Sequence, residues 1–225
     1  SGFRDGVVHP RILADETTCA TLARNRHPVR EMLLRRMVAH VESGRDGTYD
    51  RRTIALALLA RLTGERRWRD EAIARAMELV ARRAWGYHDR PGIMGWNNDR
   101  DTGDRMYEVA VVFDWLRDAL NPTQRARIAD KLGYHADIAY RATLVQKDYW
   151  YHRCFEAHGQ GLWLGLAAAS AALLGHDARA LGWFEWCLGG FDDAATHLPD
   201  DGITPWPVFN VGWHIHTLAL LESVV

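Results

Sequence analysis

The densest group of residues able to do chemistry lies between Trp150 and Gln160, in the sequence WYHRCFEAHGQ. Its aromatic side chains suit a sugar-binding groove, because pyranose rings have apolar faces that stack on indole and phenol rings. His158 lies where a helix rich in small residues is expected to begin, and a neutral imidazole there can take or orient a proton. The alternative is that these aromatic rings cap the core and that His158 is a structural histidine.

Other candidate groups point to less specific chemistry. Asp148, Asp200 and Asp201 are loop carboxylates that a glycoside hydrolase could use, although a loop aspartate more often caps a turn. Cys154 and His158 have the i, i+4 spacing of a helical metal pair, but no third ligand occurs at a usable spacing. The sequence has no glycine-rich phosphate loop and no GxSxG motif. We therefore expect neither a metal nor a cofactor.

The elements that position these residues are predicted by a repeat. Three times an apolar, alanine-rich segment runs into a short turn and out into a charged amphipathic segment, at residues 62–66, 120–124 and 174–177. The turns recur about every 55 residues, a spacing typical of stacked helical hairpins, because one hairpin cannot bury its apolar face alone. The sequence therefore predicts an all-α solenoid or toroid.

The expected helices are joined by long aromatic loops. A first helix follows the cap cluster at 15–18, and the others are expected at 29–42, 51–62, 66–83, 104–120, 122–144, 156–174, 178–198 and 214–225. Loops at 84–103, 147–153 and 199–212 hold much of the aromatic, histidine and asparagine content, so function is expected there. The small residues at the start of the 156–174 helix allow close approach of another helix or of a substrate.

Composition excludes several classes of protein. The hydrophobic fraction of 48% and the charged fraction of 25% are those of a globular domain, and we expect one domain over 1–225, as a piece of a longer chain. A net charge of -1 favours neither nucleic acid nor an anionic membrane as partner. No apolar run reaches the roughly 20 residues of a membrane span. The three cysteines show no CxxC spacing and are expected to be free, mostly buried thiols.

Several stretches, in order along nearly the whole chain, resemble one family. They are HPRIL at 9–13, ALALLARLTGERRW at 55–68, VFDWLRDALNPTQR at 112–125, residues 158–165 with the alanine run after them, WFEW at 183–186 and the Asp-Gly pair at 201–202. Together they resemble the N-terminal (α/α) toroid of heparinase II/III-like polysaccharide lyases, the group that includes oligoalginate lyases. The β-sandwich domain that follows the toroid in that family is absent from this chain.

The resemblance implies cleavage of a uronate polysaccharide by β-elimination. A side chain neutralises the C5 carboxylate, a base removes the C5 proton, and an acid protonates the leaving glycosidic oxygen. His158 aligns with the family's helix-mouth histidine, as base or carboxylate partner. We expect His214 or Tyr151 to donate the proton, and Asn98 and Arg153 to bind the carboxylate. The substrate-binding candidates are Trp150, His152, Asn97, Trp206, Phe209, Asn210 and Trp213.

The sequence also departs from the family pattern. The acidic residue that usually follows the histidine by three positions is Gly161 here. The family's catalytic tyrosine is expected about 50 to 55 residues after the histidine, a separation taken from the resemblance, but this chain has no tyrosine after Tyr151. A non-catalytic glycan-binding toroid and a glycoside hydrolase of the same architecture are therefore the alternatives. The resemblance leaves the polymer and the oligomeric state open, and family members are often periplasmic or secreted.

Overall fold

The regular structure of the described residues is entirely helical. The computed structural model describes residues 9–44, 51–86, 99–142, 157–196 and 208–224, without the side chains of 157, 158, 194, 195 and 208–214. Within these ranges the prediction of an all-α chain is confirmed. The helices are α1 (Glu16–Arg24), α2 (Pro28–Glu42), α3 (Arg52–Thr63), α4 (Arg66–Ala81), α5 (Arg100–Trp115), η1 (Arg117–Ala119), α6 (Pro122–Arg141), α7 (Ala157–Leu173), α8 (Ala180–Ala195) and α9 (Val208–Val224).

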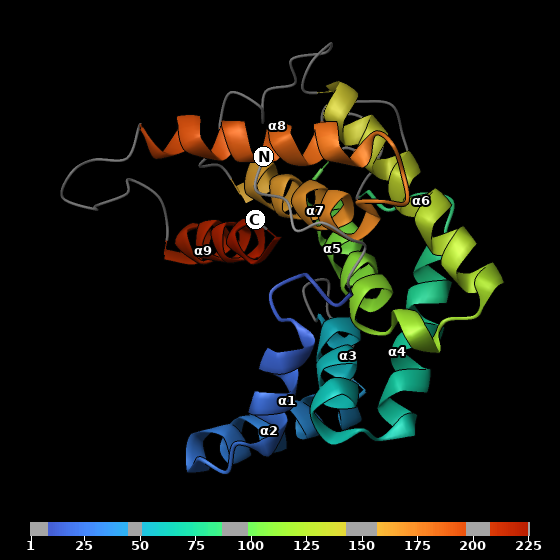
Figure 1. Ribbon diagram of the computed structural model, residues 1–225, viewed down its shortest axis with the longest axis vertical. Helices are drawn as coiled ribbons and strands as arrows, with labels where there is room; N and C mark the ends of the chain where they lie inside the picture. The colour runs from blue at the N-terminus through green and yellow to red at the C-terminus, as the bar shows by residue number, and fades with distance from the viewer. Residues whose placement is uncertain (1–8, 45–50, 87–98, 143–156, 197–207, 225) are drawn as a thin grey trace.

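The helices pair as three consecutive hairpins, α3–α4, α5–α6 and α7–α8 (Figure 1). Gly64 ends α3 with a φ of 71°, a left-handed conformation that glycine adopts at no steric cost. A capping box between Asn121 and Gln124 begins α6, with Pro122 in its first turn. Helices α3, α5, α7 and α9 contact one another in sequence, as do α4, α6 and α8. The predicted turns therefore fold as predicted and build two neighbouring rows of helices.

Two of the expected loops are shorter than the sequence indicated. Helix α5 begins at Arg100 rather than at 104, because the Asp99 side chain accepts a hydrogen bond of 3.0 Å from the backbone N–H of Thr102 and caps the helix. Helix α9 begins at Val208 rather than at 214. The prediction that Phe209 and Asn210 lie in a loop is wrong, because both belong to the first turn of α9.

Helices α5 and α7 cross in direct backbone contact. A Cβ atom on Gly103 would collide with the carbonyl oxygen of Gly161 and lie 2.6 Å from the Cα atom of Leu162. A Cβ atom on Gly165 would lie 2.5 Å from the Cα atom of Gly103. At the other end of the pair, the ring of Phe113 lies 5.8 Å from that of His176, just after α7. The two helices therefore run in the same direction, and the glycines allow their backbones to approach closely.

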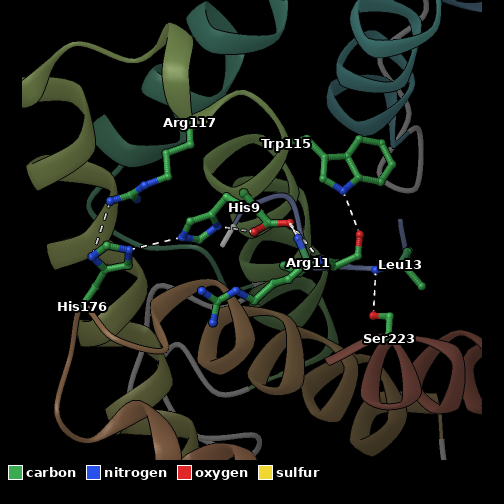
Figure 2. Close-up of polar contacts among 9 residues, drawn as sticks. His9, Arg11, Leu13, Trp115, Arg117, His176 and Ser223 are labelled. Atoms are coloured by element: carbon green, nitrogen blue, oxygen red, sulfur yellow. Dashed lines mark hydrogen bonds and ion pairs between the residues drawn. The ribbon is translucent and has the colours of Figure 1, made fainter. Parts of the chain in front are cut away.

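The segment that contains the HPRIL motif packs against the C-terminal end of α5 (Figure 2). The Asp114 carboxylate, fully buried, accepts a hydrogen bond of 2.5 Å from the His9 ring and bonds of 2.8 Å each from the backbone N–H groups of Arg11 and Ile12. The Trp115 indole donates to the carbonyl oxygen of Ile12, also at 2.8 Å. The backbone N–H of Leu13 donates to Ser223 of α9. This segment therefore joins α5 to α9.

A series of polar contacts leads from Asp114 to the surface. His9 Nε2 lies 3.3 Å from His176 Nε2, and His176 Nδ1 lies 3.5 Å from Arg117 Nη2 (Figure 2). Arginine only donates, so His176 accepts at Nδ1 and carries its proton on Nε2, which leaves the His9 proton on Nδ1 facing Asp114. Burial and the neighbouring cation Arg117 lower the pKa of His176 to about 4, which agrees with a neutral ring.

In the second row, a buried histidine is packed between aromatic rings. His135 of α6 stacks on Trp85, with ring centroids 4.2 Å apart, and meets the edge of Tyr134 at 5.1 Å. Neither ring nitrogen of His135 has a hydrogen-bond partner among the described residues, although the side chain is fully buried. Burial, with a smaller effect of the Lys131 charge, lowers its pKa from 6.5 to about 3. His135 is therefore a neutral spacer that supports Tyr134.

Replacing His135 with phenylalanine is expected to make the protein more resistant to acid. The unfolded chain binds a proton at His135 as the pH falls through about 6.5, whereas the folded chain does so only near 3, so stability is lost between these values. The slope from this one group reaches at most about 1.4 kcal/mol per pH unit. Urea unfolding of wild type and His135→Phe from pH 7 to pH 4 should show a difference that grows with acidity; parallel curves would contradict this.

Within the described ranges, none of the helices combines the length and apolar character needed to cross a lipid bilayer. Cys19 and Cys187 are both buried and free, as predicted, and Cys154 lies outside the described residues.

Candidate functional site

Most of the residues selected from the sequence lie outside the described part of the chain. Tyr151, Arg153, Asn98, Trp150, His152, Asn97 and Trp206 all belong to the undescribed segments. Of His158 in α7, and of His214, Phe209, Asn210 and Trp213 in α9, the backbone alone is described. What the structure adds is the place of these helices, and the side chains from other elements that surround them.

The first turns of α5 and α7 lie side by side. His158 precedes Gly161 by one turn of α7, and Gly161 is in backbone contact with Gly103 of α5. The backbone of His158 therefore lies at the end of the helix pair where α5 begins, the end to which Asp104 also belongs. The segments that hold Asn97, Asn98, Tyr151 and Arg153 connect directly to the beginnings of these two helices.

An arginine from a third helix reaches the same end. Arg51, the N-cap of α3, has its Nη2 atom 3.4 Å from the Asp104 Oδ1 atom and its Nη1 atom 3.3 Å from Nδ1 of His216 in α9. Its guanidinium also lies over the ring of Tyr107, 5.4 Å from the centroid. Two helices, α5 and α9, thus hold the guanidinium at the start of α3, and the Arg51 side chain remains 27% exposed and able to meet a ligand.

The charges of this group are shaped by burial. Desolvation raises the pKa of Asp104 from 3.8 to about 6; the charge of Arg51 acts in the opposite direction, and the carboxylate of Glu108 adds to the rise. One oxygen of Asp104, Oδ2, has no hydrogen-bond partner within the described ranges, although the residue is only 5% exposed. Burial, and then the charge of Arg51, lowers the pKa of His216, which favours its neutral form.

This arrangement is suited to binding an anion next to a proton acceptor. Amide groups at the start of α5 are directed to the same end as the Arg51 guanidinium, and both attract a carboxylate. Neutral His216 can accept a proton there, and Asp104 can exist in both protonation states near neutral pH. No three histidine, cysteine or acidic side chains in the described ranges come together as a group able to hold a metal ion.

Sequence reasoning missed Arg51, Asp104 and His216. Arg51 was read as the first residue of a helix, and Asp104 as the start of another. His216 was only one residue of the helix expected at 214–225, and the structure places it in α9. The signal that could have found Asp104 is its place among buried neighbours in α5, where an unpaired carboxylate is expensive.

Comparison with known proteins gives no match: no protein-family model matches the sequence, and no curated protein matches it significantly.

Proposed function

We propose that this chain is the (α/α) toroid domain of a polysaccharide lyase that cleaves a uronate polymer by β-elimination. The observation that carries the proposal is the position of Arg51, held between Asp104 and His216 at the end of α5 where α7 also begins, with His158 in its first turn. The order of the helices supports a toroid, because α3, α5, α7 and α9 make one row and α4, α6 and α8 a second.

In this mechanism the Arg51 guanidinium binds the C5 carboxylate of the uronate and withdraws charge from it, so that the C5 proton becomes acidic. His158 or His216 takes that proton. The electron pair of the C5–H bond forms the C4–C5 double bond as the bond from C4 to the glycosidic oxygen breaks, and that oxygen is protonated by His214 or Tyr151. The products are a new non-reducing end that carries an unsaturated uronate and a shortened chain with a free hydroxyl.

The reaction can be tested by ultraviolet absorbance of the unsaturated uronate, with alginate, polygalacturonate, heparin and chondroitin as substrates. We expect one polymer to give product, and Arg51→Gln and His158→Ala each to reduce kcat/KM by about 100-fold or more, the size of effect that removal of one group stabilising transition-state charge usually has. Arg26→Gln is the matched control, because the Arg26 side chain is 80% exposed and is not part of this group.

The same assay separates the two alternatives. Binding of an acidic polymer with no product from any of them would contradict the lyase and favour a glycan-binding toroid. Saturated products would favour a glycoside hydrolase, for which Asp104 and Glu108 of α5 are a candidate pair of carboxylates, both nearly fully buried. Wild-type activity of Arg51→Gln would show that Arg51 does not bind the reacting uronate.

A further inference from the structure

A second candidate site lies in the row of helices that contains α4 and α6, and it shares no residue with the Arg51 group. A cavity of about 500 Å³ opens between α4 and α6 and is lined by Val80, Arg83, Arg127, Asp130, Lys131 and Tyr134. Three cations and one carboxylate give this lining a net charge of +2, in a chain whose net charge is -1. Electrostatic attraction at this groove therefore favours an anionic ligand.

The groove presents one exposed aromatic ring on a rigid support. Tyr134 is 47% exposed, and its ring rests against buried His135, which in turn stacks on Trp85. The Lys131 amine lies 5.9 Å from the Tyr134 centroid and 5.6 Å from that of Trp85, and it donates to the carbonyl oxygens of Arg82 and Arg83 at the end of α4. Tyr134 is therefore held in place before any ligand binds, which lowers the entropic cost of stacking.

Burying His135 beneath Tyr134 lowers the stability of the fold, which indicates that the exposed Tyr134 ring has a function. His135 is fully buried, and both of its ring nitrogens lack a hydrogen-bond partner in the described part of the chain, a loss of hydrogen bonding that an apolar side chain would avoid. Arg127, on the same helix, is exposed and makes no ion pair or hydrogen bond within the described ranges, so its guanidinium is available. An exposed ring beside an available guanidinium suits a ligand with both an apolar ring face and a carboxylate or sulfate group.

We propose that the groove between α4 and α6 binds one acidic sugar unit of a polysaccharide, with the sugar ring stacked on Tyr134 and its acidic group bound by Arg127. The choice of a uronate as that sugar rests on the proposed function, whereas the choice of an acidic ring rests on the groove itself. Such a site would hold a long polymer on the outer surface while another part of it reaches the Arg51 end.

The test measures binding of hexasaccharides of alginate, polygalacturonate and chondroitin sulfate by calorimetry, in the Arg51→Gln background so that the Arg51 end contributes less. We expect Tyr134→Ala and Arg127→Gln each to weaken the affinity for one acidic hexasaccharide on the order of tenfold. A neutral cello-hexaose should not bind. Arg66→Gln is the matched control, because it removes the same charge from the exposed start of α4, outside the groove.

Three results would overturn the site: no acidic hexasaccharide binds, both groove variants bind as Arg66→Gln does, or polyglutamate competes as well as the sugar, which would indicate only a polyanion effect. The two proposals can fail separately. If the wild-type protein forms unsaturated product and the groove variants bind the hexasaccharide as strongly as the control does, the groove proposal fails and the lyase proposal stands. Weakened binding in the groove variants, with no unsaturated product from any polymer, keeps the groove and removes the lyase.

Discussion

A Gly103→Ala variant is expected to lose about 3 kcal/mol or more of its free energy of unfolding, because the added methyl group has no place between α5 and α7. It would collide with the Gly161 carbonyl and lie 2.6 Å from the Leu162 Cα atom, and backbone atoms cannot rotate away as a flexible side chain can. For a chain of this size the loss corresponds to a decrease of about 6–12 °C in Tm. Thermal and urea unfolding measure it.

Gly182→Ala is the matched control for this prediction. Gly182 lies in α8, and a Cβ atom there would meet nothing within 4 Å. Alanine in a helix is favoured over glycine by about 0.5–1 kcal/mol, so the same chemical change should raise stability at this position. Effects of the same sign and size at the two glycines would show that α5 and α7 do not cross in backbone contact at Gly103.

The crossing also positions the candidate site. Asp104, which contacts Arg51, follows Gly103, and His158 lies one turn before Gly161, so separation of the helices would change the position of His158 relative to the Arg51–Asp104 pair. We therefore expect the Gly103→Ala protein that remains folded to lose the activity predicted for the Arg51 end, while Gly182→Ala keeps it. If Gly103→Ala shows the expected loss of stability but each folded molecule keeps wild-type activity, the packing of α5 against α7 does not position the site.

The hairpins could be predicted from the sequence because their signals are local. A turn such as Leu62-Thr63-Gly64 follows an apolar run directly, and a glycine at the end of a helical segment commonly ends the helix. The start of α5 was missed because Asp99, its cap, lies in a stretch that reads as loop. The capping bond from Thr102 can be inferred only if the segment is already known to be helical.

The candidate site could not be assembled in the same way. Arg51 is 53 residues from Asp104 and 165 from His216, and no periodicity in the chain relates the three. Sequence reasoning gave weight instead to the aromatic loops, and most of the residues chosen there lie outside the described part of the chain. HPRIL and the VFDW stretch were selected only for their resemblance to one family, and nothing in the sequence showed that the two segments bind each other through Asp114. A single carboxylate in the apolar run of α5 was the available signal for that contact.

Removing the Asp114 carboxylate is expected to destabilise the protein by about 3–5 kcal/mol, the usual cost of breaking a fully buried polar group that has several partners. In Asp114→Ala the backbone N–H groups of Arg11 and Ile12 and the His9 ring lose their common acceptor. Asn in this position keeps the size but replaces one acceptor oxygen by a donor, which would face a donor from the N-terminal segment. Urea unfolding should therefore rank wild type above Asp114→Asn and Asp114→Ala.

Asp118→Ala is the control, because Asp118 lies in the short η1 helix one turn beyond Asp114 and is exposed, so its removal should change stability by less than about 0.5 kcal/mol. Hydrogen exchange gives a second, local measurement. If Asp114 fastens the N-terminal segment to α5, the Ile12 amide should exchange at a rate close to that of an unfolded chain in Asp114→Ala while the amides of α4 stay protected. Protection of Ile12 equal to that in wild type would show that Trp115 and Ser223 alone hold the segment in place.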